Sequence, residues 1–178
     1  MTYCRRTLNY WIVCVFATGI FALSGITVLE AQTRNRDEVS CRAFVQQFYD
    51  WYVNPYVTHG QGPAWYDVGR LKPQILSPEL RRLLMKESDE EKACGCIDHL
   101  DSDPFVNSQD PYRKYVVKSV SAADGQCNAI VEGATEVRPE LMRTATGWVF
   151  VNFHYRYYSE DGKTKLYPDD DLIHMLKR

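Results

Sequence analysis

The sequence predicts an α+β domain in which a long N-terminal aromatic helix packs in a curved antiparallel sheet, with a short helix at the C-terminus. Apolar side chains recur at helical spacing between residues 37 and 92. Alternating apolar and polar residues, interrupted by glycine turns, dominate residues 112–167. Helices that precede a run of strands are typical of a fold that keeps the two apart, and not of alternating βαβ units.

The composition excludes several classes of protein. The 178 residues are 45% hydrophobic and 13% aromatic, which is too apolar for a disordered chain. A formal net charge of -2 is too small to draw the chain to nucleic acid. Residues 32–178 are enough for a single domain with its own core.

The first 31 residues are typical of a secretory signal peptide. Arg5 and Arg6 form a basic start, and the stretch Tyr10–Leu29 carries no charge. An uncleaved membrane anchor through residues 10–29 is the alternative, because about 20 apolar residues span a bilayer. Either interpretation places the domain outside the cytoplasm, in the periplasm or the extracellular space.

The longest helix is predicted over residues 37–56. Phe48 and Tyr52 lie one turn apart on one face, and a second apolar stripe runs beside them through Tyr49. A helix that is apolar over so wide an arc must be wrapped by other structure, most simply by a curved sheet. Pro55 is expected to end it or to lie close to its end.

A second helix is predicted over residues 76–92. Ser77 is placed to cap its start, and Pro78 fits the first helical position. Its acidic end, residues 87–91, is expected to face solvent.

Strands are predicted after residue 112, separated by turn signals such as Asp124-Gly125. They cover residues 112–121, 127–137, 140–145, 148–158 and 165–167, before a terminal helix at residues 172–176 that Asp169 to Asp171 cap. In the 148–158 strand, the face expected to form the core carries Val149, Val151, Phe153, Tyr155 and Tyr157. The opposite face carries Trp148, Phe150, Asn152, His154 and Arg156.

Four cysteines lie in the predicted domain, namely Cys41, Cys94, Cys96 and Cys127. An exported domain favours two disulfides among them. Because Cys94 and Cys96 are only two residues apart, each is expected to pair with one of the two distant cysteines and not to close a local ring. Two alternatives remain open: a zinc site that begins at Cys94-x-Cys96-x-x-His99, and a redox-active Cys-Gly-Cys pair.

Four motifs follow one another along the domain. They are Phe44-x-x-x-Phe48-Tyr49-x-Trp51-Tyr52, Leu76-Ser77-Pro78-Glu79-Leu80, Asp101-x-Asp103-Pro104-Phe105 followed by Gln109-Asp110, and Asn152-Phe153-x-Tyr155. In this order, over roughly residues 40–177, they resemble the bacterial exported family called domain of unknown function 3828. The resemblance implies a nuclear transport factor 2-like cone and an exported location. That family has no established activity, so the resemblance implies no function.

The densest group of polar side chains lies between residues 98 and 110. Its candidate ligand-binding residues are Asp101, Asp103, Gln109 and Asp110. Carboxylates this close together are able to bind a metal or to share a proton. A calcium loop is disfavoured because Phe105 stands where an oxygen ligand is needed. The simpler interpretation is that the Asp side chains stabilise turns in this segment.

Two further sets of residues are candidates. Tyr49 and Tyr52 either line a ligand cavity or belong to the core, which is the commoner role of aromatic residues at helical spacing. Asn152 and His154 either line a pocket, where His154 acts as a general base with an aspartate partner, or face solvent or another chain.

The sequence therefore predicts a non-catalytic exported domain that binds a small molecule or a protein, without cofactor, metal or nucleic acid. Membrane contact is expected only through residues 10–29, if these are retained. Two alternatives stay open: an isomerase, dehydratase or hydrolase with a His154–Asp pair in a cone pocket, and an inhibitor or immunity-type protein that binds through the acidic loop. No catalytic residue is assigned, because the sequence has no nucleophile elbow or phosphate loop.

Overall fold

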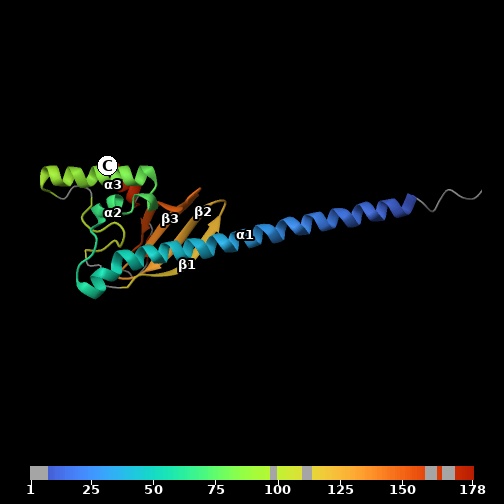
Figure 1. Ribbon diagram of the computed structural model, residues 1–178, viewed down its shortest axis with the longest axis horizontal. Coiled ribbons are helices and arrows are strands. Elements are labelled where there is room, and N and C mark those ends of the chain that lie inside the picture. Colours follow the sequence, from blue (N-terminus) through green and yellow to red (C-terminus); the bar gives the residue numbers. More distant parts are fainter. Residues whose placement is uncertain (1–7, 97–99, 110–113, 159–163, 166–170) are drawn as a thin grey trace, which may run out of the picture. The chain divides into compact units, whose positions relative to one another are not determined.

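The computed structural model describes residues 8–96, 100–109, 114–158, 164–165 and 171–178, with side chains for residues 31–96, 100–109, 114–156 and 171–178. The chain separates into two units, residues 1–36 and residues 37–178, and the second holds the α+β domain (Figure 1). The predicted boundary near residue 31 stays a prediction. In the part of the chain whose side chains are described, no helix is long and apolar enough to cross a membrane.

The domain has helices first and an antiparallel sheet after them, so the α+β prediction is confirmed (Figure 1). The helices are α1 (Leu8–His59), which begins in the first unit, α2 (Trp65–Leu71), the 3-10 turn η1 (Pro73–Ile75), α3 (Pro78–Cys94) and α4 (Leu172–Met175). The strands are β1 (Val116–Ala123), β2 (Gln126–Glu132), β3 (Glu136–Thr144), β4 (Gly147–Tyr155), β5 (Tyr157–Tyr158) and β6 (Thr164–Lys165). The sequence pattern does not predict α2 or η1.

Helix α1 continues past Pro55 to His59, so the proline does not itself end the helix but lies close to its end, as predicted. A proline removes one backbone donor, but burial of Tyr52 and Val53 in the core holds the last turns in helical form. The helix ends before Gly60, whose φ of 73° is the left-handed conformation common at helix ends. The Gly60 N–H donates to Tyr56 O (2.9 Å).

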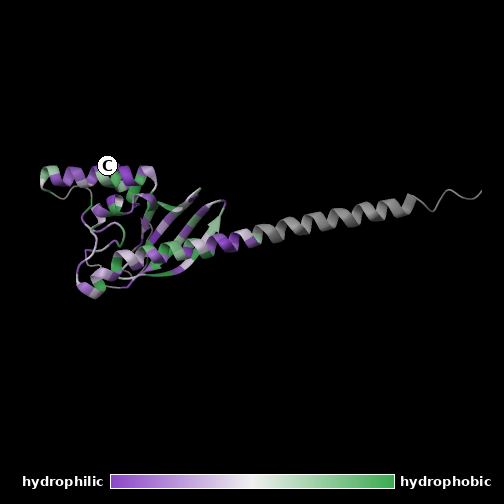
Figure 2. Cartoon of the chain, in the orientation of Figure 1, coloured by the Kyte–Doolittle hydropathy of each residue, from purple (hydrophilic) through white to green (hydrophobic). Residues whose placement is uncertain are grey.

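Helix α3 starts as predicted, because the Ser77 side chain accepts a hydrogen bond from the Leu80 N–H (3.2 Å). The expectation that its acidic end faces solvent is wrong at Glu87 and Ser88, which are each 2% exposed. Glu87 follows Leu80 by seven residues and therefore lies on the same buried stripe of the helix. Figure 2 shows that hydrophilic residues otherwise dominate α3.

Strands β1 to β4 form one antiparallel sheet in chain order. The turn between β1 and β2 is the predicted Asp124-Gly125, and both φ angles are positive (52° and 74°), as a two-residue hairpin between twisted strands requires. Strands β5 and β6 form a separate pair. The predicted 165–167 strand overlaps β6 at Lys165, and its last two residues lie outside the described part.

A β-bulge in β4 changes which side chains reach the core. Glu140 of β3 pairs with Asn152 of β4. The next residue, Leu141, pairs with Phe150, so β4 carries an extra residue between the two pairs. The predicted strict alternation is therefore wrong. Phe150 is fully buried although alternation places it on the polar face, and Val151 is only partly buried although alternation places it in the core.

Trp148 is also buried, at 5% exposure, although alternation places it on the polar face. Its indole N–H donates to Ser40 Oγ of α1 (2.9 Å). Val149, its neighbour, is 7% exposed. The start of β4 is therefore covered on both faces, which no period-two pattern describes.

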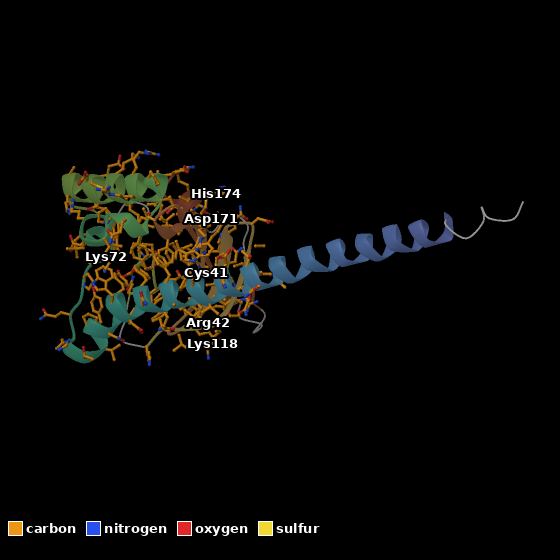
Figure 3. The ribbon with its side chains drawn as sticks, turned by 45° about the vertical axis from the view of Figure 1, so that its right-hand side comes forward. Cys41, Arg42, Lys72, Lys118, Asp171 and His174 are labelled. Atoms are coloured by element: carbon orange, nitrogen blue, oxygen red, sulfur yellow. A yellow bond between two sulfur atoms is a disulfide. The ribbon has the colours of Figure 1, made fainter. Side chains whose placement is uncertain are left out.

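Both edges of the sheet are held by other elements. At the β1 edge, Arg42 Nη1 of α1 donates to Val117 O (2.7 Å), and the Val117 N–H donates to Gln46 Oε1 (3.0 Å); Arg42 is labelled in Figure 3. At the β4 edge, the Ser77 N–H donates to Phe150 O (2.8 Å). These bonds place α1 and the start of α3 against the sheet and occupy backbone groups that an open edge would expose.

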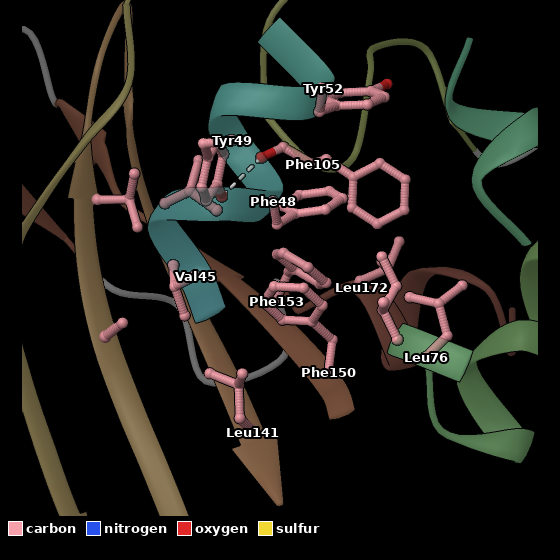
Figure 4. Packing of buried hydrophobic residues seen from close by; sticks show 14 of the residues in the cluster. Val45, Phe48, Tyr49, Tyr52, Leu76, Phe105, Leu141, Phe150, Phe153 and Leu172 are labelled. Atoms are coloured by element: carbon pink, nitrogen blue, oxygen red, sulfur yellow. Dashed lines mark hydrogen bonds between the residues drawn. The ribbon is translucent and has the colours of Figure 1, made fainter. Parts of the chain in front are cut away.

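The core is an aromatic cluster between α1 and the sheet (Figure 4). The ring of Phe48 lies among other rings, at centroid distances of 4.9 Å (Phe150), 5.4 Å (Phe105) and 5.4 Å (Tyr52). Tilted, edge-to-face and stacked pairs of this kind contribute about 0.5–1.5 kcal/mol each beyond burial. The aromatic face of α1 is therefore the main apolar partner of the sheet.

The prediction of two disulfides is confirmed, but the predicted pairing is wrong: the bonds join Cys41 to Cys127 and Cys94 to Cys96. Cys41 on α1 and Cys127 on β2 meet in the core, where both are fully buried. Cys94 and Cys96 close a local ring because Gly95, with a φ of 67°, turns the chain back after α3. Their sulfur atoms are bonded to each other, so the zinc alternative loses two of its ligands.

Removal of the buried disulfide, in the variant Cys41→Ala/Cys127→Ala, is expected to lower the free energy of unfolding by about 4–5 kcal/mol. The reason is that this bond spans a sequence separation of 86 residues. Urea denaturation measures the loss. The control Cys94→Ala/Cys96→Ala opens a ring with one residue between the cysteines and is expected to lose less than about 1 kcal/mol. Equal losses in the two variants would contradict this assignment.

Candidate functional site

The loop at residues 100–109, here called the Asp103 loop, lies between α3 and β1 in the sequence. It passes through the core. Four tyrosine hydroxyls, here called the tyrosine clamp, donate hydrogen bonds to it. The pairs are Tyr52 to Asp103 Oδ2, Tyr155 to Pro104 O (2.9 Å), Tyr49 to Phe105 O (2.9 Å) and Tyr115 to Val106 O (3.0 Å). Four consecutive residues are therefore each held by a different tyrosine, and Figure 4 shows the bond from Tyr49.

The tyrosine clamp draws on three parts of the fold. Tyr49 and Tyr52 belong to α1, Tyr115 precedes β1, and Tyr155 ends β4. All four are 1% exposed or less. Burial raises the pKa of the Tyr49, Tyr52 and Tyr115 hydroxyls, so they keep the protons they donate. An irregular loop inside a core needs such donors, because a buried carbonyl without a partner costs about 1–3 kcal/mol.

Asp103 is the ionisable group at the centre of this arrangement. Its Oδ1 accepts from the Phe105 N–H (2.9 Å), and its Oδ2 accepts from the Tyr52 hydroxyl. Burial raises the pKa of Asp103 to about 6, although the hydrogen bonds favour the charged form and offset part of the effect. The Asp103 carbonyl also accepts from the Asn107 N–H (2.7 Å). Asp103 thus anchors the loop through both its side chain and its backbone.

A pocket of about 350 Å³ lies beside the Asp103 loop. It is lined by Leu100, Asp101, Ser102, Pro104, Asn107, Ser108, Gln109, Tyr155 and Met175. All but two of these residues belong to the loop; Tyr155 also belongs to the tyrosine clamp, and Met175 comes from α4. The Asp101 and Gln109 side chains are exposed, and Gln109 Nε2 donates to the Asp101 carbonyl (3.1 Å). The lining therefore combines hydroxyl, amide and carboxylate groups with apolar surface.

The structure brings part of the predicted site together. Of the candidates, Tyr49, Tyr52 and Asp103 lie at the tyrosine clamp, Asp101 and Gln109 line the pocket, and Asp110 lies outside the described residues. Tyr49 and Tyr52 do not line this pocket. Their hydroxyls hold the loop that lines it. The acidic loop and the aromatic helix, treated separately in sequence, form one structural unit.

Asn152 and His154 lie elsewhere, on the outer face of the sheet. His154 Nε2 is 3.3 Å from Glu140 Oε2, and the two side chains are 38% and 35% exposed. Asn152 Nδ2 donates to Asp171 Oδ1 (2.8 Å). His154 thus pairs with a glutamate on a partly open face and does not line the pocket, so this geometry gives no support to the His154–Asp alternative.

Sequence reasoning missed a contact between Asp171 and His174 (Figure 3). The predicted Asp171 cap of α4 is confirmed: its side chain accepts from the His174 N–H (3.0 Å) and lies 2.5 Å from His174 Nδ1. Burial favours the neutral form of Asp171, but hydrogen bonds from Asn152 and His174 outweigh it and hold the pKa of that carboxyl below its ordinary value. The available signal was the Asp-x-x-His spacing, which resembles a capping box. Asp169 and Asp170 lie outside the described residues.

No group of three or more His, Cys, Asp or Glu side chains is placed to hold a metal ion within the described segments. Asp98, His99 and Asp110, which the sequence places in the acidic cluster, lie outside those segments.

Comparison with models of known protein families, with curated proteins and with solved structures gives no match for this chain. The function is therefore inferred from the geometry of the site.

Asp103 is expected to make stability depend on pH. Its folded pKa of about 6 lies above the ordinary value of 3.8, so the folded state holds the proton more tightly. The stability from this proton is fully present below the ordinary pKa and is lost as the pH rises through the folded pKa. The difference in unfolding free energy between the wild type and Asp103→Asn should fall by up to about 3 kcal/mol from about pH 4 to pH 8. Urea titrations across this range measure it, and a constant difference would contradict the raised pKa.

The variant Tyr49→Phe keeps the ring but removes the donor to the Phe105 carbonyl. We expect a loss of about 1–2 kcal/mol in unfolding free energy, and a similar loss for Tyr155→Phe, because each leaves a buried acceptor without its partner. Tyr66→Phe is the matched control, since Tyr66 is 39% exposed, and it should change stability by less than about 0.5 kcal/mol. Clamp variants no less stable than this control would show that the hydroxyls do not hold the loop.

Proposed function

We propose that residues 37–178 form an exported binding domain that holds a compact polar ligand in the pocket beside the Asp103 loop. The observation that carries the proposal is a pocket of about 350 Å³ whose lining loop is fixed to the core by the tyrosine clamp. Pockets for small molecules commonly start at about 300 Å³ and place a few polar groups on a largely preformed wall.

The chemistry of the lining indicates the kind of ligand. Asp101 offers a carboxylate, and Asn107 and Gln109 offer amide groups that both donate and accept. Leu100 and Met175 add apolar surface. This combination suits a small molecule with several hydroxyl or amine donors on one side and a carbon skeleton on the other.

The tyrosine clamp supports binding because it orders the loop before a ligand arrives. A loop that must become ordered on binding loses affinity to the entropy of ordering, whereas a loop already held avoids this cost. Tyr155 belongs both to the tyrosine clamp and to the pocket, since its hydroxyl donates to the Pro104 carbonyl and the residue lines the pocket. Four buried hydroxyls hold this one loop, which is the arrangement expected of a binding surface that must keep its shape.

Two further features support the location and architecture in this proposal. The buried Cys41–Cys127 disulfide favours an oxidising compartment, in agreement with export by the N-terminal segment. The aromatic face of α1 packed on an antiparallel sheet agrees with the nuclear transport factor 2-like cone, which we include in the proposal.

The test is a thermal-shift screen of the full chain against sugars, polyols, amino acids and diamines, followed by calorimetry of any compound that raises Tm. We expect a donor-rich compound to bind, and Gln109→Ala and Asp101→Asn each to weaken it by about tenfold, equivalent to about 1.4 kcal/mol. Asp124→Asn, an exposed substitution in the β1–β2 turn, is the control and should leave affinity unchanged. If none of the four classes binds, or if the control weakens binding as much, the proposal fails.

A further inference from the structure

The Cys94–Cys96 disulfide is exposed at the C-terminus of α3. Both cysteines and Gly95 between them are accessible to solvent, and the two Cα atoms are 5.2 Å apart. Gly95 adopts a left-handed conformation with a φ of 67°, and a Cβ there would meet no neighbouring atom within 4 Å. Among the described residues nothing covers this side of Gly95, and both cysteines are exposed at the end of the helix, where a second molecule can approach the ring.

This bond does little to stabilise the fold. A disulfide stabilises mainly by closing a long loop in the unfolded chain, and here a single residue separates the cysteines. The Cys41–Cys127 bond is the opposite case, because it spans 86 residues and is fully buried. Buried bonds that close long loops resist reduction, whereas exposed ones are the labile or catalytic kind. The same chain thus holds one disulfide suited to structure and one suited to exchange.

The polar contacts of Cys94 Sγ do not select one direction of attack. The Cys96 N–H lies 3.1 Å from this sulfur and would stabilise negative charge on it. The Glu91 and Cys96 carbonyl oxygens lie 3.5 and 3.6 Å from the same sulfur and oppose such charge. Either sulfur of the ring can therefore be attacked, with the other as the leaving group.

We propose that the Cys94–Cys96 disulfide is a thiol–disulfide exchange site, which oxidises a pair of cysteine thiols in another exported protein. One thiolate of the partner attacks one sulfur of the ring; the S–S bond breaks, and its electron pair stays on the other sulfur. The partner's second thiolate then attacks the partner sulfur of the mixed disulfide, and the attacked cysteine leaves as a thiolate. The partner loses two electrons and gains a disulfide, while Cys94 and Cys96 end as two thiols after proton uptake. A low-molecular-weight disulfide such as oxidised glutathione restores the ring by the reverse exchange.

This activity is independent of the ligand pocket. It uses residues at the end of α3, none of which lines the pocket, and it needs no small-molecule ligand. If no ligand bound to the pocket, the exchange proposal would not be contradicted. If no exchange occurred at the ring, the ligand-binding proposal would not be contradicted.

The experiment mixes the oxidised full chain, without oxygen, with an equimolar reduced peptide that carries two cysteines. We expect one peptide disulfide to form for each chain, at least about tenfold faster than with the same concentration of oxidised glutathione. Alkylation and mass spectrometry should map the new thiols to Cys94 and Cys96, with Cys41 and Cys127 still bonded. The control Cys94→Ala/Cys96→Ala should leave the peptide reduced.

Three results would overturn the proposal: a wild-type chain that leaves the peptide reduced, new thiols that map to Cys41 and Cys127, or peptide oxidation that persists in the control variant. The mapping uses the wild-type chain alone, so it decides the question even if the control variant does not fold. Circular dichroism before and after exchange should be unchanged, because the bond that holds the fold is the buried one.

Discussion

A segment without regular secondary structure crosses the aromatic core at residues 103–106. Its polar groups can be buried there because tyrosine hydroxyls donate hydrogen bonds to the Asp103 carboxylate and to three backbone carbonyls. This burial constrains the other elements. Helix α1 must present Tyr49 and Tyr52, β4 must end with Tyr155 facing inward, and the chain before β1 must place Tyr115 beside them. Tyrosine suits this task because its ring adds to the apolar packing while its hydroxyl reaches a carbonyl. The loop, the first helix and the last long strand therefore depend on one another, and a shift in one would leave buried acceptors in the others without donors.

The sheet carries a second constraint, in the β-bulge of β4. If β4 paired regularly, strict alternation would direct Phe150 and Phe153, three positions apart, to opposite faces, and the aromatic cluster around Phe48 would lose one of them. With the bulge, both rings reach the core, while Asn152 and His154 stay on the outer face. The bulge also lies where the Ser77 N–H bonds the Phe150 carbonyl, so the start of α3 meets β4 at its point of irregular pairing. Packing of the rings thus outweighs the regular ladder at this position.

The two disulfides and the pocket differ in their access to solvent. The Cys41–Cys127 bond ties α1 to β2 inside the core. The pocket and the Cys94–Cys96 ring both lie at surfaces, but on different elements and with different chemistry. A packed interior that carries two accessible sites is typical of a scaffold on which loops supply function. The ionisation of Asp103 links the interior to the surface, because the same residue anchors the loop that lines the pocket.

Local sequence determined the parts of this protein that depend on neighbouring residues. The α+β class follows from the order of periodic segments, the Ser77 and Asp171 caps follow from residue types at helix starts, and the β1–β2 turn follows from Asp124-Gly125. Sequence also selected Asp101, Asp103 and Gln109 as candidate site residues, but it did not show that Tyr115 and Tyr155 lie beside them, since residues so far apart meet only when the sheet closes on α1. Cysteine pairing, the bulge at β4 and the burial of Glu87 were likewise decided by the tertiary structure. The physical reason is the same in each case. A close-packed core selects the arrangement that buries its rings and satisfies its polar groups at the same time, and a pattern along the chain does not report which distant residues achieve this.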